Sequence, residues 1–423
     1  MKVNLSYGRT DLPVEVPDNC TTVIRPSHLR SLPNVETRIM DALRNPIGTP
    51  ALRSIVKPHH RVVISVCDIT RPMPSSTLLP IILSELDHVP RENILILIAT
   101  GTHRTNNDTE LRNMLGDRVI DNYKVANHNA FDKSMLAHVA NTPSGIPIVL
   151  NRKWVESDIK ITTGFVEPHF FAGFSGGPKM VAPGLASFET IMELHNSNMI
   201  SDPQSTWGIT RGNPIHDEIR QIANQTGVDF SVDVTINRNK EITSIHAGDL
   251  FAVHEMACMV SKTASMRSVN NTFDVVITSN SGYPLDINLY QSIKGISAAS
   301  RVVKEGGTII CAAECRDGIP NHGEYGRILE SRENPKELLE MITSGDYNRH
   351  DQWQVQIQAQ IQMKSRVYLK SSYLSNAQIR SAHLEPVEII EDTVTEALSR
   401  AGQHATLCIL PEGPQTIPYL NPT

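Results

Sequence analysis

The chain has 423 residues, of which 40% are hydrophobic and 20% are charged, and its net charge is −6 at pH 7. This balance excludes a disordered chain, a fibre or a coiled coil, because enough apolar surface is present to build a core. Binding to nucleic acid is not expected either, since the chain is acidic and shows no block of Lys and Arg.

Six cysteines are scattered along the chain and do not indicate a disulfide framework. Only Cys311 and Cys315 lie close together, and a buried strand thiol beside a loop thiol explains them better than a zinc site. Reduced thiols are typical of the cytoplasm. The first residues, MKVNLSYGRTDLP, have no apolar core of signal-peptide length, and no run of about 18 apolar residues follows. We therefore expect a cytoplasmic protein with no membrane span.

Apolar runs alternate with helix-like stretches in the first half of the chain. Runs rich in Ile and Val at 61–68, 94–101 and 159–164 are bounded by polar turns and predict buried parallel strands. Helical patterns lie at 74–90, despite an internal proline, and at 107–115, where Asn and Asp provide capping signals. Strand, helix and strand in this order are the α/β pattern.

The pattern changes after residue 228 and then restarts. Two alternating runs within 228–248 flank the turn NRNK and predict a β-hairpin, which a helix at 251–265 and a polar linker at 268–272 follow. Further strands are predicted at the positions 273–282, 306–314, 365–372 and 404–413. We predict an α/β protein of two α/β domains with mainly parallel sheets and an active site in the crevice between them, where the carboxyl ends of the strands lie. The predicted domains are an N-terminal domain over 1–267 and a Rossmann-like domain over 268–384, with 385–423 returning to the first domain.

Two polar clusters follow directly on predicted strands. In DITRP, Asp68 ends a strand and Arg71 offers a planar fork suited to a carboxylate or phosphate. An ion pair between Asp68 and Arg71 within the loop explains this cluster equally well. In ATGTHRTN, His103 follows the next strand and would project into the crevice, although a histidine in a loop is more often an ordinary polar residue.

The third cluster is the most informative one, GFVEPHFFAGFSGGPKMVAPG at 164–184. Its glycines allow backbone N–H groups to approach an anion closely, and Lys179 closes the loop. The ending G-P-K-M departs from the G-K-[ST] ending of a P-loop, so a Walker-type ATPase is not expected. A glycine turn that serves only packing would leave His169 and Lys179 in one short loop without a reason.

Two helices carry further candidates. His195 lies near the end of a helical pattern at 189–200, and with His103 and His169 it indicates a metal site or an acid–base pair. In LYQSIKG, Tyr290 and Lys294 share one helix face, which is also what an ordinary exposed helix would show.

Together these motifs resemble the nickel-dependent lactate racemases and their relatives, which use a nickel-pincer nucleotide. The resemblance covers nearly the whole chain and rests on the motifs DITRP, GTHR, EPHFFAGFSGGPK, ELHN, YQSIKG and DQW, in order and at family-like spacing. None of these motifs is specific alone, but the combination is. The resemblance implies a racemase or epimerase of 2-hydroxy acids, such as lactate.

The resemblance also implies roles for single residues. Lys179 resembles the lysine that holds the cofactor, a pyridinium-3-thioamide-5-thiocarboxylic acid mononucleotide, through a covalent bond. His195 resembles the protein ligand of Ni(II), for which neutral imidazole is suited. His103 and His169 resemble the two acid–base residues. Further cofactor-binding positions are implied at Asp68, Gly173, Ser175, Gly176 and Gly177. Substrate-binding positions are implied at Arg71, Tyr290, Gln291, Lys294 and Trp353.

These residue types fit a hydride mechanism. The C2–H of a 2-hydroxy acid is a very weak carbon acid because its carboxylate is already negative, so loss of hydride to give a planar 2-keto acid is easier than loss of a proton. A general base must take the hydroxyl proton in the same step. Two histidines, one for each enantiomer, meet that need. The expected partners are a small 2-hydroxy acid and, transiently, the proteins that make the cofactor.

Two other classes of protein stay open. One is a different metalloenzyme, such as a zinc hydrolase that uses three histidines. The other is a protein that stores or carries the nickel nucleotide without catalysis, although storage needs no acid–base pair.

Overall fold

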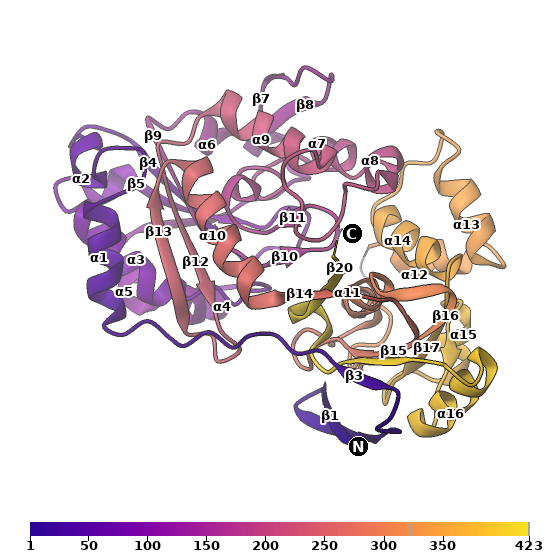
Figure 1. Ribbon diagram of the computed structural model, residues 1–423. Coiled ribbons are helices and arrows are strands. Elements are labelled where there is room, and N and C mark those ends of the chain that lie inside the picture. Colours follow the sequence, from indigo (N-terminus) through magenta and orange to yellow (C-terminus); the bar gives the residue numbers. More distant parts are fainter. Residues whose placement is uncertain (322, 422–423) are drawn as a thin grey trace. The chain divides into compact units, whose positions relative to one another are not determined.

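The computed structural model describes residues 1–321 and 323–421, and the chain divides into two units (Figure 1). The glycine-loop unit, named for the loop 164–184, comprises residues 28–195 and 202–264. The terminal unit, named for the first and last elements of the chain, comprises residues 1–27, 196–201 and 265–423.

A six-stranded sheet forms the centre of the glycine-loop unit. Its strands are β4 (Val62–Cys67), β5 (Ile94–Ala99), β6 (Lys124–Asn127), β9 (Ile159–Phe165), β12 (Phe230–Ile236) and β13 (Ile242–Gly248). The order is β13–β12–β9–β4–β5–β6, and all neighbours are parallel except β12 and β13, which form an antiparallel hairpin. Every residue of β4 is buried, as a central parallel strand requires. The predicted strands and hairpin of this half are confirmed.

The helices of the glycine-loop unit are α1 (Val35–Arg44), α2 (Leu52–Ile55), α3 (Ser75–Glu85), α4 (Asp108–Leu115), α5 (Asp117–Asn122), α6 (Arg152–Val155), α7 (Phe188–Leu194), α9 (Pro214–Thr226) and α10 (Leu250–Ser265). Among them, α1 to α5 contribute buried apolar residues to the core of this sheet. Leu43 of α1 and Leu79 of α3 are fully buried in one core with Ile64 of β4. A capping box of Asn107 and Glu110 begins α4, as the capping signals predicted.

The terminal unit has its own six-stranded sheet. Its strands are β3 (Thr21–Val23), β15 (Phe273–Ser279), β16 (Val303–Ala312), β17 (Arg366–Lys370), β18 (Glu385–Pro386) and β19 (Leu407–Leu410). They lie in the order β18–β17–β16–β15–β19–β3 and every pair is parallel. The helices are α8 (Ser197–Ser201), α11 (Leu289–Ser300), α12 (Tyr325–Glu330), α13 (Pro335–Ile342), α14 (Gln352–Gln362), α15 (Asn376–Ser381) and α16 (Ile390–Ala401).

The last forty residues do not return to the first domain as predicted. Residues 385–423 belong to the terminal unit, where β19 lies between β15 and β3. All four residues of β19 are buried, and a strand of this kind needs a neighbour on each side. One neighbour, β3, comes from the first 27 residues, which the sequence placed in the other domain.

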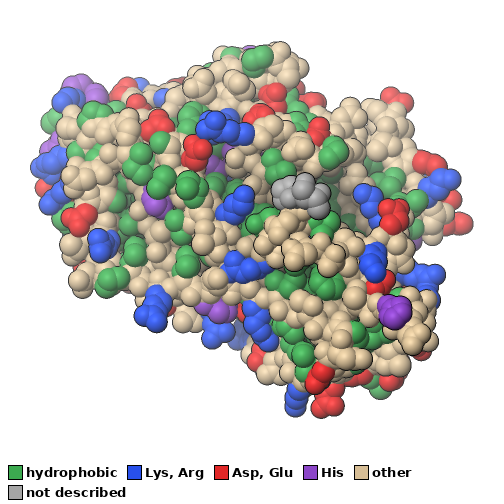
Figure 2. Space-filling view, viewed as in Figure 1, with side chains coloured by type: hydrophobic (Ala, Val, Ile, Leu, Met, Phe, Trp, Pro, Cys, Tyr) green, Lys and Arg blue, Asp and Glu red, His purple; other side chains and the backbone are tan. Residues whose placement is uncertain are grey.

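The predicted linker at 268–272 is partly a strand. β14 (Met266–Val269) pairs in parallel with β20 (Ile417–Leu420), so the end of the chain is fixed beside the start of the second α/β segment. The face shown in Figure 2 carries Lys and Arg side chains interspersed with Asp and Glu. Within residues 1–321 and 323–421, no helix has both the length and the apolar character needed to cross a membrane.

Candidate active site

Asp68 and His103 lie at the carboxyl ends of two neighbouring parallel strands. β4 ends at Cys67 and β5 ends at Ala99, so both loops leave the same edge of the sheet. Nδ1 of His103 donates a hydrogen bond to Oδ2 of Asp68 at 2.6 Å. The Asp68 side chain is 4% exposed, whereas that of His103 is 44% exposed. A buried carboxylate thus orients an accessible histidine.

The environment of Asp68 keeps its carboxyl group ionised. Burial raises the pKa of Asp68, but the hydrogen bond from His103 and the nearby charges of His103 and Arg71 outweigh burial and lower this pKa below its ordinary value. The other oxygen, Oδ1, accepts from N and Oγ1 of Thr70 at 3.2 and 2.6 Å. The carboxylate is therefore bonded to His103 and Thr70, while Arg71 is joined to Asp68 through the backbone. Because an anion holds its Nδ1–H, neutral His103 carries its lone pair on Nε2.

His169 lies in a short hairpin of the glycine loop. β10 (Pro168–His169) pairs antiparallel with β11 (Gly173–Phe174). Nδ1 of His169 accepts a hydrogen bond from the N–H of Ala172 at 3.3 Å. Neutral His169 therefore carries its proton on Nε2, the reverse of the arrangement in His103. The two neutral rings thus differ in which nitrogen carries the proton.

Phe171 connects three of the predicted site residues. Its ring lies 4.5 Å from the ring of His169 and 5.1 Å from the ring of His195, both edge-on. Nζ of Lys179 lies 5.7 Å from the centre of the same ring. The structure therefore gathers His169, Lys179 and His195 around one buried aromatic side chain. The sequence did not reveal this role, because two consecutive phenylalanines in a loop are equally typical of ordinary core packing.

His195 is the C-terminal cap of α7 and is only 6% exposed. Its Nδ1 donates a hydrogen bond to the carbonyl oxygen of Ile191 at 2.7 Å. Because the proton sits on Nδ1, Nε2 carries the lone pair that a metal ion needs. The orientation of His195 is thus the one expected of a metal ligand.

Two glycines give the loop a shape that no other residue would allow. Gly173 has a φ of 77°, and a Cβ there would lie 2.0 Å from the carbonyl oxygen of Ile209. Gly177 has a φ of 50°, and a Cβ there would lie 2.4 Å from the imidazole of His254. Because both positions combine a positive φ with a close contact, a larger residue would displace the loop that carries Lys179.

Buried polar side chains hold the backbone of this loop. The hydroxyl of Ser175 donates to the carbonyl oxygen of Phe165 at 2.7 Å. Oδ1 of Asp233 accepts from the N–H of Gly177 at 3.2 Å, and Nε2 of His254 donates to the carbonyl oxygen of Ser175 at 2.9 Å. These contacts fix the segment immediately before Lys179.

Burial determines the protonation of the groups around the loop. It raises the pKa of Asp233 to about 7 and lowers the pKa of His254 to about 4. His216, whose ring stacks on that of His254 at 5.4 Å, also has a pKa well below its ordinary value, first because of burial. The positive charge of Lys179 lowers the pKa of both histidines further, so both are neutral at pH 7. The sequence signal for Asp233 was a carboxylate inside an apolar strand, FSVDVTI.

The terminal unit carries the remaining predicted residues. Nε1 of Trp353, on α14, donates to Oη of Tyr290, on α11, at 3.2 Å. Gln291 and Lys294 follow on the first turns of α11, which begins at Leu289 after the cap Asn288. The structure thus brings Tyr290 and Trp353 together, and a meeting of this group with the glycine loop stays a prediction.

The histidines do not form a three-ligand metal site. Among residues 1–321 and 323–421, no three or more His, Cys, Asp or Glu side chains are grouped so that they could hold a metal ion. A zinc hydrolase of the kind considered above would require such a group.

Comparisons with known proteins point to one family. Residues 7–208 match the model of the lactate racemase N-terminal domain, and residues 269–417 match the model of the lactate racemase C-terminal domain. The lactate racemase of Lactiplantibacillus plantarum is 36% identical over 376 residues, which cover 88% of each chain. The lactate racemase of Thermoanaerobacterium thermosaccharolyticum is 33% identical over 422 residues, or 98% of each chain.

Solved structures show the same architecture. The lactate racemase apoprotein from Thermoanaerobacterium thermosaccharolyticum superposes with a TM-score of 0.92 at 31% identity, over 99% of this chain and 100% of that one. A protein of Thermotoga maritima has a TM-score of 0.70 at 20% identity, over 91% of this chain and 98% of that one, which shows the likeness of fold alone. The predicted α/β fold with two domains and mainly parallel sheets is confirmed.

Proposed function

Because this chain belongs to the lactate racemase family and is an isomerase, we propose that it interconverts the two enantiomers of a 2-hydroxy carboxylate, with lactate as the first candidate. The observation that carries the proposal is the 2.6 Å hydrogen bond between Nδ1 of His103 and the buried carboxylate of Asp68. This contact supports a role for His103 as a general base at Nε2. Racemisation needs such a base at the hydroxyl group of the substrate.

The two histidines divide the proton transfers between them. Nε2 of His103 takes the hydroxyl proton of one enantiomer, and the anionic Asp68 stabilises the imidazolium that forms. His169, in its protonated imidazolium form, then returns a proton to the oxygen on the opposite side and is left neutral, which gives the other enantiomer. In the reverse direction the roles exchange. Neutral His103 has its lone pair on Nε2 and can act as a base directly, whereas His169 must first take up a second proton before it can donate one.

We propose that a nickel-pincer nucleotide, the pyridinium-3-thioamide-5-thiocarboxylic acid mononucleotide, is the cofactor. Lys179 would hold it covalently and His195 would provide the protein ligand of Ni(II), since Nε2 of His195 carries a lone pair and Phe171 packs against both residues. When bound, this group would supply a reversible acceptor for the C2 hydride, so that a planar 2-keto acid can form. The proteins that make the cofactor would be transient partners.

The glycine loop would hold the nucleotide by its backbone and not by the Ser175 hydroxyl, which is bonded to the loop itself. Gly173 and Gly176 place no side chain between their backbone and the nucleotide, whereas the N–H of Gly177 already donates to Asp233. Arg71 lies near the charged Asp68–His103 pair and is suited to the substrate carboxylate. Tyr290, Gln291, Lys294 and Trp353 stay proposed substrate-binding residues. The resemblance implied only a cofactor-binding role for Asp68. We propose in addition that Asp68 orients His103 by accepting its Nδ1–H.

The experiment uses the full chain, made with and without the cofactor-synthesis proteins. Each preparation is given single enantiomers of lactate and of longer 2-hydroxy acids, and the products are separated on a chiral column. We expect only the loaded protein to convert L- to D- and D- to L-forms of at least one acid. A loaded protein that leaves every enantiomer unchanged would show that it is a carrier, not a racemase.

A further inference from the structure

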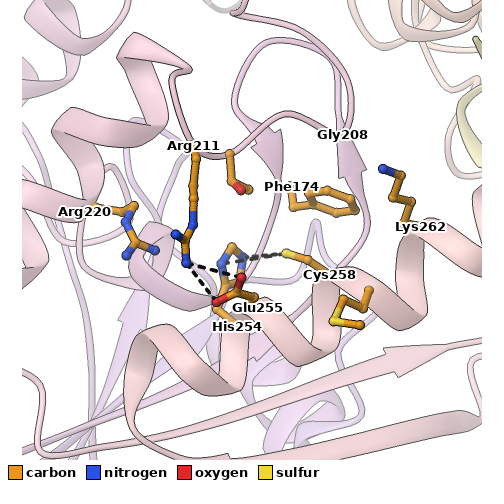
Figure 3. Close-up of a pocket in the computed structure, with 10 residues that line it drawn as sticks. Phe174, Gly208, Arg211, Arg220, His254, Glu255, Cys258 and Lys262 are labelled. Carbon is orange, nitrogen blue, oxygen red and sulfur yellow. Dashed lines mark hydrogen bonds and ion pairs between the residues drawn. The ribbon is translucent and has the colours of Figure 1, made fainter. Parts of the chain in front are cut away.

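A pocket lies on the glycine-loop unit between α9, α10 and the loop around Gly208, and Phe174 of the glycine loop and His254 form part of its lining (Figure 3). We call it the α9–α10 pocket. It has a volume of about 180 Å³, which is roughly that of six water molecules. Three of its lining residues carry positive charge, Arg211, Arg220 and Lys262, and one carries negative charge, Glu255.

The carboxylate in the pocket lining, that of Glu255, is already paired with a cation. Glu255 forms an ion pair with Arg211, with NH2 of Arg211 3.2 Å from Oε2 of Glu255. Within the described part of the chain, neither Arg220 nor Lys262 has a carboxylate partner. The guanidinium of Arg220 packs 4.3 Å from the ring centre of Phe251, which holds the side chain in place without neutralising it. The pocket therefore has two unbalanced positive charges.

The buried wall of the pocket adds no charge that would cancel them. His254, Cys258 and Lys262 are spaced four residues apart and share one face of α10. Burial lowers the pKa of His254 to about 4 and raises the pKa of the Cys258 thiol well above its ordinary value, so both groups are neutral at pH 7. An apolar, neutral wall strengthens the field of the cations beside it.

We propose that the α9–α10 pocket binds a phosphate monoester or inorganic phosphate. A phosphate group carries between one and two negative charges at pH 7 and offers several acceptor oxygens, which matches two unpaired cations. The hydroxyl of Thr210, also in the lining, can donate to the same anion. A volume of about 180 Å³ admits a phosphate group.

Two sources of this phosphate are possible in chemical terms. One is the phosphate end of the proposed cofactor, since His254 forms part of the pocket wall and also bonds to the loop that carries Lys179. This source depends on the proposed function. The other source is a separate phosphate-bearing metabolite, which does not depend on it.

The test is calorimetric titration of the unloaded full chain with inorganic phosphate, at constant ionic strength and in a buffer without other oxyanions. Arg220→Gln and Lys262→Gln should each weaken binding by about tenfold, because each removes a charge-assisted hydrogen bond. Glu255→Gln should instead strengthen binding severalfold, because it removes the only negative charge and releases Arg211. A folding defect cannot produce this gain. Arg118→Gln, on the exposed side of α5, is the matched control and should leave binding unchanged.

The same titration on the loaded protein identifies the source. Loss of phosphate binding after loading means that the cofactor phosphate occupies the pocket, and unchanged binding means a separate ligand; both outcomes keep the site. The proposal is wrong if the unloaded protein does not bind phosphate, or if it binds equally well after Arg220→Gln and Lys262→Gln. Because binding to unloaded protein needs no catalysis, its failure is distinct from failure of the racemase proposal.

Discussion

At the scale of single residues, hydrogen-bond partners assign different tasks to chemically identical side chains. His103 donates its Nδ1–H to Asp68, His169 accepts at Nδ1 from Ala172, and His195 donates its Nδ1–H to Ile191. The sequence predicted all three as functional histidines but left open whether they form a metal site or an acid–base pair. Tautomers depend on contacts between residues distant in the chain, so the motifs alone could not decide.

The substitution Asp68→Asn tests the orientation of His103. The variant keeps a polar side chain of the same size but loses the anion that stabilises the imidazolium. We expect kcat to fall by roughly 10²–10⁴-fold, as for loss of acid–base catalysis, with the covalent cofactor and nickel content unchanged. Steady-state kinetics, intact mass and metal analysis measure the three quantities. Asp158→Asn, an exposed carboxylate paired with Arg61, is the control and should keep full activity.

The tether and the metal ligand can be separated by two variants. Lys179→Ala should abolish the mass increase that the loaded protein shows, because it removes the only proposed attachment point. His195→Ala should keep the mass increase and lose most of the nickel, because it removes only the metal ligand. His138→Ala, whose side chain bonds to Asn141 on the surface, should change neither. Full nickel occupancy in His195→Ala would exclude the assigned ligand.

At the scale of elements, the glycine loop depends on strands and helices far from it in the chain. Its glycines were visible in the sequence, and so was the loop's connection to a preceding strand, whereas the short hairpin of β10 and β11 was not. Asp233 from β12 and His254 from α10, which hold the backbone of the loop, were not visible either, because each is a single polar residue within an otherwise apolar element. The role of such residues becomes apparent only from the structure, which shows the backbone groups that they bond.

The pH dependence of stability tests the burial of Asp233. Its carboxyl pKa rises from 3.8 to about 7 on folding, so between these values the unfolded chain has released a proton that the folded chain keeps. Rising pH therefore favours unfolding, by up to roughly 1.4 kcal/mol per pH unit. Asp233→Asn removes this penalty, and the stability of the variant relative to the parent should increase by a few kcal/mol, roughly, between about pH 4 and pH 7.

Urea unfolding of the unloaded protein at several pH values measures this difference. Asp158→Asn is the control, because its parent carboxyl has a pKa lowered to about 2, first by the hydrogen bond from Arg61, and is ionised throughout this range. Its stability difference should stay flat. A flat difference for Asp233→Asn as well would mean that the Asp233 carboxyl titrates normally.

At the scale of the whole molecule, the sequence predicted the alternation of strands and helices. It did not predict which segments belong to which of the two units. Most buried strands of the two sheets were recognisable from their Ile and Val residues. The sequence of β19, LCIL, however, does not indicate which of the two sheets this strand joins. Leu407 pairs with Val275 on one side and with Thr21 on the other, so β19 pairs with a strand that lies almost 400 residues earlier in the chain. Strand pairings between residues so far apart in the chain are determined by tertiary packing, so they cannot be predicted from the local sequence pattern.

The substitution Leu407→Ala tests that assignment. Leu407 is fully buried, and its truncation should lower stability by about 2–5 kcal/mol. Hydrogen exchange followed by mass spectrometry should show faster exchange in β15 and β3 than in β4 and β9. Leu79→Ala, an equally buried leucine of α3, should give the reverse pattern. If Leu407→Ala instead increased amide hydrogen exchange in β4 and β9, residue 407 would pack in the glycine-loop unit and the assignment of β19 to the terminal unit would be wrong.

The central claim is that racemisation proceeds by hydride removal at C2, with His103 and His169 handling only the hydroxyl proton. Its most direct test is conversion of C2-deuterated L-lactate in ordinary water by the loaded protein, with the isotope content of the D-lactate read by mass spectrometry. We expect the D-lactate to keep its deuterium, because the hydrogen at C2 never passes through a histidine that exchanges with water. D-Lactate that has lost its deuterium to the solvent would contradict the account, and His103 and His169 would then be acid–base residues at carbon.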